Sequence, residues 1–131
     1  MIFSRKTIII SDKSQESLPD IEADADKTMW VLNNLLSNAI KYSFENSVVE
    51  VDATKGKNTL IISVKDYGHG IDESYLPRIF ERYFQVPGPK EKGTGLGLAI
   101  SQEFIEAQNG KIWVESEIGK GSVFYIQLPF I

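Results

Sequence analysis

Two short turns between strands constrain the fold of this chain more than any other feature of its sequence. Residues 48–53 and 60–64 alternate apolar and polar side chains, as half-buried strands do, with a turn at 55–58 between them. A second pair of strands, 111–116 and 122–128, flanks a glycine-containing turn. Strands joined by such short turns run antiparallel, because a parallel pair needs a long crossover. The sequence therefore predicts two β-hairpins.

Two amphipathic helices are predicted, one on either side of the first hairpin. In residues 27–44 apolar side chains recur at helical spacing, and Asp24 or Asp26 is placed to cap the N-terminus. Residues 96–108 repeat the pattern, and the asparagine–glycine pair that follows them ends the helix. Residues 72–84 indicate one or two shorter helices.

The remaining segments complete the expected fold. A β-branched run at 7–10 predicts a first strand, residues 11–19 a loop, and residues 18–23 a further short strand. Residues 86–93, rich in proline and glycine, predict another loop. Helices that alternate with antiparallel strands have to cover one face of the sheet. We therefore expect a two-layer α/β sandwich of the α+β class.

The composition indicates a soluble globular chain with the length of one domain. It has 131 residues, of which 42% are hydrophobic and 24% charged. A net charge of −4 argues against a nucleic-acid partner, because no basic stripe stands out. The absence of cysteine excludes disulfides and thiolate metal sites. No apolar run approaches the ~20 residues that span a bilayer.

Polar side chains gather on one arc of the predicted helix 27–44. Helical spacing brings Asn34, Asn38, Lys41 and Tyr42 together, on the arc opposite the apolar one. Carboxamide oxygens suit a magnesium ion that keeps several waters, and a lysine one turn on can reach a phosphate. The tyrosine is placed to lie against a base or ribose. A solvated helix face with incidental asparagines is the alternative explanation of the same pattern.

Two glycine turns carry the rest of the chemistry. Residues 66–70 follow a strand, and the carboxylate of Asp66 can accept a hydrogen bond from an adenine amino group, while the glycines let the backbone approach the ring. Residues 93–97 precede a helix, whose N-terminal N–H groups and dipole favour an anion such as phosphate. Neither turn is specific alone, since the second matches neither the P-loop nor the dinucleotide fingerprint. Together with the amide arc, the two turns predict an ATP site.

In combination and in order, these segments resemble the boxes of the catalytic and ATP-binding domain of bacterial sensor histidine kinases, a branch of the GHKL ATPase superfamily. The resemblance covers nearly the whole chain. It implies the Bergerat fold, a mixed, mostly antiparallel sheet with about three helices on one face. The matched segments are the N box at 34–42, the G1 box at 66–70, the F box at 78–84, the G2 box at 93–98 and a closing glycine turn at 119–124.

The resemblance implies a role for each matched residue. Asn34, Asn38 and Lys41 would be the catalytic residues, and Asn38 would coordinate Mg²⁺. Asp66 would accept the adenine amino group, and Phe84 would anchor the lid over the nucleotide. The ATP-binding set implied in this way is Asn34, Asn38, Lys41, Tyr42, Asp66, Gly68, Gly70, Ile71, Phe84, Gly93, Thr94, Gly95, Leu96, Gly97 and Leu98.

The implied function is that of the kinase-competent part of a two-component sensor. The chain would bind Mg²⁺ and ATP and supply the γ-phosphoryl group to a histidine on a separate dimerisation domain, with a response regulator downstream. Residues 1–131 would form one catalytic domain, monomeric by itself and cut from a longer, membrane-anchored bacterial receptor, in which it would be cytoplasmic. His69, the one histidine, lies inside the adenine-site turn and would face solvent. The isolated chain is therefore not expected to autophosphorylate.

Two other functions share these boxes. An anti-sigma-type serine kinase would bind a sigma factor and phosphorylate a protein antagonist, and a non-catalytic module would only sense nucleotide. The box at 78–84 favours the histidine kinases, and intact Asn38 and Asp66 argue against a non-catalytic module. Trp30 stands where many family members carry Gln, Glu or Asp, and this departure keeps the non-catalytic alternative open.

Overall fold

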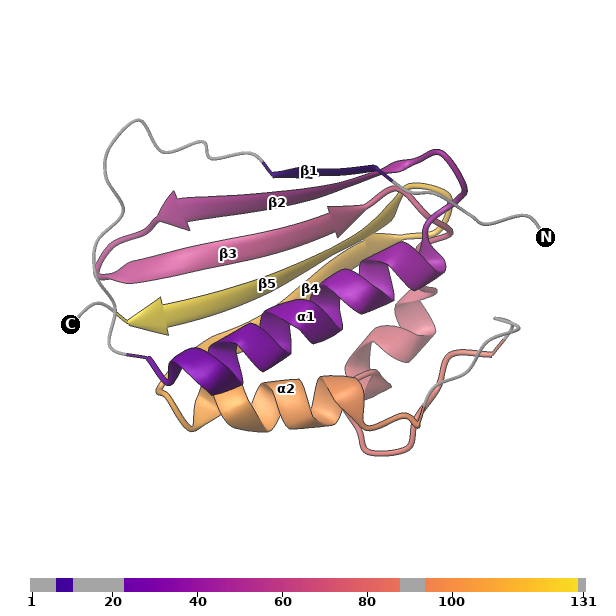
Figure 1. Ribbon diagram of the computed structural model, residues 1–131. Helices are drawn as coiled ribbons and strands as arrows, with labels where there is room; N and C mark the ends of the chain where they lie inside the picture. The colour runs from indigo at the N-terminus through magenta and orange to yellow at the C-terminus, as the bar shows by residue number, and fades with distance from the viewer. Residues whose placement is uncertain (1–6, 11–22, 88–93, 130–131) are drawn as a thin grey trace.

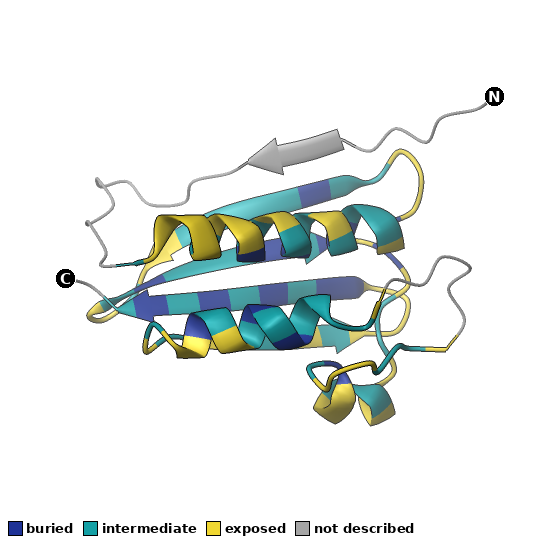
Figure 2. Cartoon of the chain, turned by 60° about the horizontal axis from the view of Figure 1, so that its bottom comes forward, coloured by how far each residue is buried: buried dark blue, intermediate teal, exposed yellow. Residues whose placement is uncertain are grey.

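A computed structural model describes residues 7–10, 23–87 and 94–129 of the chain (Figure 1). Within them, one sheet carries three helical segments, and Figures 1 and 2 both show the two long helices side by side on the same face of the sheet. In chain order the elements are β1 (Thr7–Ile10), α1 (Ala25–Tyr42), β2 (Val48–Lys55), β3 (Thr59–Asp66), the 3₁₀ helix η1 (Glu73–Arg78), α2 (Gly97–Glu106), β4 (Lys111–Glu117) and β5 (Gly121–Pro129).

The sheet has five strands in the order β1-β2-β3-β5-β4. Strands β2 and β3, and strands β4 and β5, form the two predicted antiparallel hairpins, while β1 pairs parallel to β2. The sheet is therefore mixed and mostly antiparallel, which confirms the predicted α+β sandwich with its helices on one face. Strands β3 and β5 also pair antiparallel, and this pairing sets Asp66 opposite Ser122. The end of β3 and the start of β5 consequently meet at one end of the sheet.

The core lies between the helices and the sheet face that they cover. Helix α1 buries Val31, Leu35 and Ala39, which recur every four residues, and α2 buries Ile105. Strand β5 buries every second side chain along most of its length, which Figure 2 shows as alternating dark bands. Full burial of one such aliphatic side chain stabilises the fold by about 1.5–3 kcal/mol. This shared apolar layer holds both helices to the sheet.

The ends of α1 follow from its sequence. Asp24, one of the two predicted caps, accepts a hydrogen bond from the Lys27 N–H at 3.0 Å and so satisfies a donor of the first turn. Asp26 lies in that turn, where a carboxylate favours the positive end of the helix dipole. The helix ends at Tyr42, two residues earlier than predicted, and Ser43 leaves it in an extended conformation.

The segment 72–84 is less helical than predicted. It forms only η1, which begins after the cap Asp72 and contains Pro77. Proline removes a backbone donor and so limits continuation of a helix. Further along, Tyr83 has a φ of 66°, a left-handed conformation that a bulky residue rarely adopts and that a right-handed helix cannot contain.

The amide arc of α1 does not lie opposite the buried strip, so that part of the helical-wheel prediction was wrong. The exposed strip of α1 contains Trp30, Asn33 and Ser37. Asn34 and Asn38 are half-buried and border the buried strip instead. The physical reason is that α2 packs along this side of α1 and covers it.

Some predictions fall outside the described residues. These are the loop at 11–19, most of the strand at 18–23 and most of the loop at 86–93. In the part of the chain that the structure describes, no helix combines the length and the apolar character that crossing a membrane requires.

Candidate functional site

One large cavity opens beside the C-terminal half of α1. Its volume is about 1020 Å³, and it is enclosed by parts of α1, the turn after β3, η1 and the residues that follow it, the start of α2, and the start of β5. Because these segments are far apart in the sequence, the cavity exists only in the folded chain. The predicted site residues that line it are Asn34, Asn38, Lys41, Tyr42, Asp66, Gly70, Ile71, Phe84, Thr94, Gly95, Gly97 and Leu98.

Asp66 supplies the cavity with a buried carboxylate. Only 4% of its surface is exposed, and it is the only buried carboxylate among the described residues. Its Oδ1 accepts a hydrogen bond from the Gly68 N–H at 2.9 Å, which holds the carboxylate in a defined orientation at the end of β3. An ionised carboxylate only accepts hydrogen bonds, so it suits a ligand group that donates, such as an aromatic amine.

Gly68 shapes the cavity without lining it. A Cβ added there would lie 2.1 Å from the Tyr42 carbonyl oxygen, so the turn after β3 packs directly against the end of α1. The same turn is tied to the last hairpin, since the Ile71 N–H donates to the Ser116 Oγ at 2.7 Å. Ser116 and Ser122 share a further hydrogen bond at 2.7 Å. The turn that follows Asp66 is therefore held by the end of α1 on one side and by the last hairpin on the other.

The α1 wall brings the amide and cationic side chains to the same cavity. Asn34 and Asn38 lie one turn apart, and the Asn34 Nδ2 donates to the Ser101 Oγ at 3.1 Å. The Lys41 Nζ lies 5.3 Å from the ring centroid of Tyr42, a cation–π contact that holds both side chains at the end of the helix. The wall thus offers neutral oxygens and one positive charge.

The start of α2 closes the opposite side of the cavity. A Cβ added to Gly97 would lie 2.5 Å from the Asn34 Oδ1, so a larger residue would displace that side chain. Gly95 has a φ of 75°, and its carbonyl oxygen accepts a hydrogen bond from the Tyr83 N–H at 2.7 Å. These contacts hold the N-terminal end of α2, with its partial positive charge, against the cavity.

One further group, Asp72, contributes charge at the cavity. Asp72 lies on its rim, and hydrogen bonds from the Ser74 hydroxyl and N–H hold the pKa of Asp72 below its usual value. No cluster of three or more His, Cys, Asp or Glu side chains that could hold a metal occurs among residues 7–10, 23–87 and 94–129.

Comparison with known proteins assigns the chain to a family. A family model described as "Histidine kinase-, DNA gyrase B-, and HSP90-like ATPase" matches residues 23–131. The chain belongs to this family. Within it, the chain is similar to the Bacillus subtilis sensor histidine kinase WalK, with 41% identity over 123 residues. That match covers 87% of this chain and 20% of WalK, so the chain spans about a fifth of the length of the curated relative.

Solved structures share the fold of this chain. Full-length ShkA in complex with AMPPNP superposes with a TM-score of 0.82 and 32% identity, over 95% of this chain and 26% of ShkA. The mycobacterial sensor histidine kinase MprB superposes with a TM-score of 0.81 and 23% identity, over 95% of this chain and 81% of the MprB structure. The second likeness shows the fold alone.

Two predicted site residues of this histidine-kinase-type chain do not line the cavity in the described structure, and a third was predicted where the structure is not described. Gly68 lies behind it, and Leu96 precedes α2 without contributing to the wall. Gly93 lies outside the described residues. His69 is exposed, as expected, but it also lines the cavity, with its ring centroid 4.3 Å from that of Phe44.

Sequence reasoning missed part of the cavity wall. That part comes from η1 and from the last hairpin. In the hairpin the resemblance had placed a glycine turn but no site residue. The β3–β5 pairing could have found the β5 part of this wall, because a residue paired with Asp66 must lie beside the same turn, but it gives no signal for η1. The residues missed in this way include Tyr75, Ile79, Ile118, Ser122 and Phe124.

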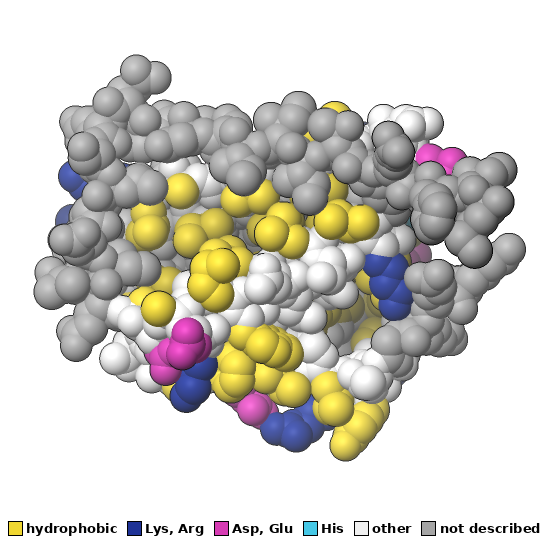
Figure 3. Space-filling view, in the orientation of Figure 1, with side chains coloured by type: hydrophobic (Ala, Val, Ile, Leu, Met, Phe, Trp, Pro, Cys, Tyr) yellow, Lys and Arg dark blue, Asp and Glu magenta, His cyan; other side chains and the backbone are white. Residues whose placement is uncertain are grey.

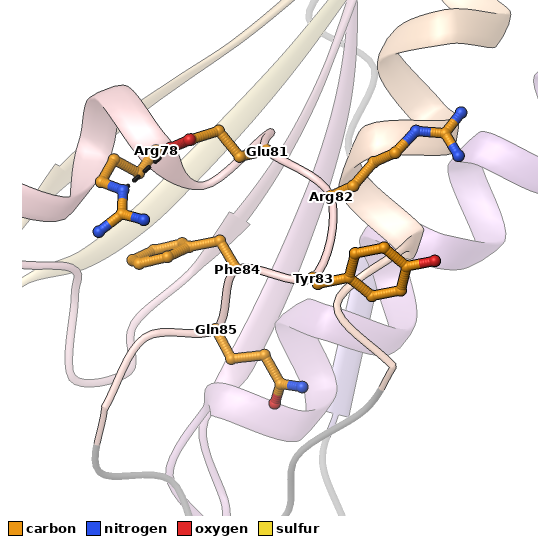
Figure 4. A pocket seen from close by; sticks show the side chains of 6 residues that line it. All are labelled: Arg78, Glu81, Arg82, Tyr83, Phe84 and Gln85. Atoms are coloured by element: carbon orange, nitrogen blue, oxygen red, sulfur yellow. Dashed lines mark hydrogen bonds and ion pairs between the residues drawn. The ribbon is translucent and has the colours of Figure 1, made fainter.

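A second, shallower hollow of about 420 Å³ lies next to the F box (Figure 4). Its two cations are already paired: Arg78 with Glu81 at 3.0 Å, and Arg82 with Glu103 of α2. Arg78 also lies over the Phe84 ring, 4.5 Å from its centroid. The hollow is therefore a surface held together by its own ion pairs, and we assign it no ligand.

Trp30, the departure from the family pattern, does not line the large cavity. The Trp30 ring meets the Phe104 ring edge-to-face, with centroids 5.4 Å apart. The Lys27 Nζ lies over the Phe104 ring, 5.4 Å from its centroid. Figure 3 shows hydrophobic side chains gathered over α1 and α2 on this side of the molecule. In this structure Trp30 therefore connects the two helices.

Proposed function

We propose that this chain binds ATP together with Mg²⁺ in the large cavity and supplies the γ-phosphoryl group for phosphorylation of a histidine on a separate domain. One observation carries the proposal. The buried carboxylate of Asp66 and the polar wall of α1 line the same cavity of about 1020 Å³. A fixed acceptor suits the amino group of a purine, which donates. Amide and cationic groups suit a polyphosphate.

The residues present fit an adenine nucleotide. Asp66 would accept from the adenine amino group, and Gly70 and Ile71 would line the ring pocket. Lys41 would contact phosphate, and Tyr42 would flank the base or ribose. The α2 end near Gly97 would present backbone N–H groups to the phosphates, because the start of a helix favours an anion.

The residues present also fit Mg²⁺, on the chemistry of the donors. Mg²⁺ prefers oxygen ligands and keeps several waters, so one carboxamide oxygen together with phosphate oxygens is a sufficient set. Asn38 would supply that oxygen, with Asn34 one turn away beside the phosphates. Bound Mg²⁺ would neutralise phosphate charge, which a single lysine on this wall cannot do alone.

The wider role follows from the family and is part of the proposal. Residues 1–131 would act as one catalytic domain of a longer receptor, on the cytoplasmic side of a membrane. Its partners would be a dimerisation domain that carries the phosphoacceptor histidine and a downstream response regulator. The likeness to WalK over about a fifth of that protein's length supports this placement.

Isothermal titration calorimetry of the 131-residue chain tests the binding step. We expect ADP and the non-hydrolysable analogue AMPPNP to bind in the presence of Mg²⁺, and the guanine analogues to bind far more weakly. Equal affinity for adenine and guanine nucleotides, or no binding of either, would contradict the proposal.

A further inference from the structure

The turn after β3 carries the one histidine of the chain, His69, to the wall of the large cavity. The glycines on either side of it have no room for a side chain. A Cβ added to Gly68 or to Gly70 would lie 2.1 Å from a backbone carbonyl oxygen of another segment. The His69 carbonyl oxygen also accepts a hydrogen bond from the Gly119 N–H at 2.9 Å. The packed backbone therefore fixes the place from which the His69 side chain starts.

A second aromatic ring restricts the imidazole of His69. The ring centroids of His69 and Phe44 lie 4.3 Å apart and the ring planes meet at 69°, which is an edge-to-face contact. Such a contact takes up at most one face of the imidazole, so Phe44 leaves at least one face uncovered. His69 lines the cavity although it is exposed, whereas Phe44 does not line it. The imidazole is therefore part of the cavity rim, and Phe44 holds it there.

The imidazole lies close to the place proposed for the base. His69 follows Asp66 by three residues, and a stretch of that length spans at most about 11 Å. Ile118 lines the same cavity next to Gly70, where an added Cβ would lie 3.0 Å from the Ile118 Cα, yet 61% of Ile118 is exposed. An apolar side chain and an aromatic ring that are both exposed at one rim suit a flat, apolar ligand group that covers them.

A purine base is such a group, because both of its faces are aromatic. We propose that His69 contacts the base of the bound nucleotide with a face of its imidazole, while Asp66 accepts from the amino group at the edge of the base. This inference rests on the proposed function, because it adds a binding residue to the same cavity. Stacking is possible with any base, whereas a fixed acceptor selects an amino group. His69 therefore contributes affinity, and Asp66 contributes selectivity.

The direct measurement is proton NMR of the imidazole, on the 131-residue chain without a histidine tag. Because the chain has one histidine, its ring C–H signals are identified without further assignment. A base stacked on the imidazole shields these protons through its ring current. We expect saturable upfield shifts with ADP in Mg²⁺ and with adenosine, which has no phosphate, but not with inorganic pyrophosphate, which has no base. Repeating the titrations at a second pH separates ring-current shifts from changes of protonation.

Calorimetry on variants measures what the contact contributes to binding. His69→Ala should lower the affinity for ADP in Mg²⁺ about 5- to 30-fold, which lies within the range for the loss of one base–aromatic stack. AMPPNP carries the same base and should lose affinity by the same factor. His69→Phe keeps a flat aromatic ring and should recover most of the loss. Thermal unfolding of each variant without nucleotide reports any change of stability separately.

Two further variants separate contact with the base from packing of the turn. Tyr67→Ala removes an exposed aromatic ring of the same turn that does not line the cavity, and it should leave the affinity for ADP unchanged. Phe44→Ala should weaken ADP binding only through His69. Added to His69→Ala, it should therefore lower the affinity no further. If His69→Ala does not fold, the NMR titration of the wild-type chain still decides.

Imidazole signals that stay in place while ADP saturates the chain would overturn the inference. So would an unchanged affinity for ADP in the folded His69→Ala variant, or a loss that His69→Phe does not recover. In each of these cases ADP still binds, and the proposed function stands. If the wild-type chain binds no adenine nucleotide, the proposed function fails and the inference fails with it.

Discussion

At the scale of single residues, the cavity depends on a few atoms that have no room to move. Asp66 is buried and its Oδ1 is held by the Gly68 N–H. Gly121 packs against the same strand end, since a Cβ there would lie 2.1 Å from the Asp66 carbonyl oxygen. The surrounding backbone therefore fixes the position of the Asp66 carboxylate. Which ligand group it binds then depends on its ability to accept hydrogen bonds.

Asp66→Asn should weaken binding of adenine nucleotides and reduce the preference for adenine over guanine. An amide can present a donor where the carboxylate only accepts, and a mismatched buried hydrogen bond costs ~1–3 kcal/mol, which is about 5- to 150-fold in affinity. Calorimetry with ADP and GDP measures both effects. Asp26→Asn, a matched change in the first turn of α1, should leave them unaltered. An unchanged ADP affinity in the Asp66 variant would remove this residue from the site.

Gly97→Ala should separate stability from binding. The atoms nearest to the added methyl group belong to the amide of the Asn34 side chain, which can move aside, and alanine is a better helix former than glycine by up to ~1 kcal/mol. We expect thermal unfolding without nucleotide at the same or a higher temperature, together with a loss of affinity for AMPPNP.

Gly119→Ala is the opposite case and serves as the comparison. Nothing lies within 4 Å of an added Cβ at Gly119, but its φ of 84° strains any other residue by roughly 1–2 kcal/mol. This variant should lose stability and keep most of its affinity. If Gly97→Ala behaves in the same way, the contact with Asn34 has no part in binding.

At the scale of elements, the helices and hairpins could be predicted because their signals are local. The cap at Asp24, the apolar spacing of α1 and the two short turns are each read from neighbouring residues. Local signals failed where the outcome depends on packing. The Tyr83 backbone and the position of the amide arc are set by contacts with Gly95 and α2, which the sequence does not reveal.

Asp24→Ala should destabilise α1 without affecting the cavity. The lost cap is worth about 1 kcal/mol, and it lies at the end of the helix remote from Asn38 and Lys41. Urea unfolding should show a lower midpoint with an unchanged slope, and the affinity for ADP in Mg²⁺ should match the wild type. A large loss of affinity would mean that the whole helix, rather than its C-terminal half, is coupled to the site.

At the scale of the whole molecule, the cavity is built from segments that the β3–β5 pairing and the α1–α2 contact bring together. The five sequence boxes could be recognised in order, yet the wall from the last hairpin depends on strand register and escaped prediction. The one histidine, His69, is exposed and its ring contacts Phe44. His69 lines the large cavity, and the proposed function gives it no role as a phosphoacceptor.

The purified chain should therefore show little self-phosphorylation in ATP and Mg²⁺, because the proposed acceptor histidine lies on another domain. Adding a helical domain that carries such a histidine should restore transfer. Labelled phosphate that is stable to base and labile to acid reports a phosphohistidine. Its appearance on the 131-residue chain alone, and its loss in His69→Ala, would contradict this account.

The most direct test of the central claim, that the large cavity is the ATP site, is NMR mapping of amide shifts during titration with AMPPNP and Mg²⁺. The account predicts large, saturable changes at Asn34, Asn38, Asp66 and Gly97, and none at the indole N–H of Trp113, which stacks on Tyr125 away from the cavity. Shifts that cluster at Arg78 and Arg82 instead, or that spare the cavity, would contradict it.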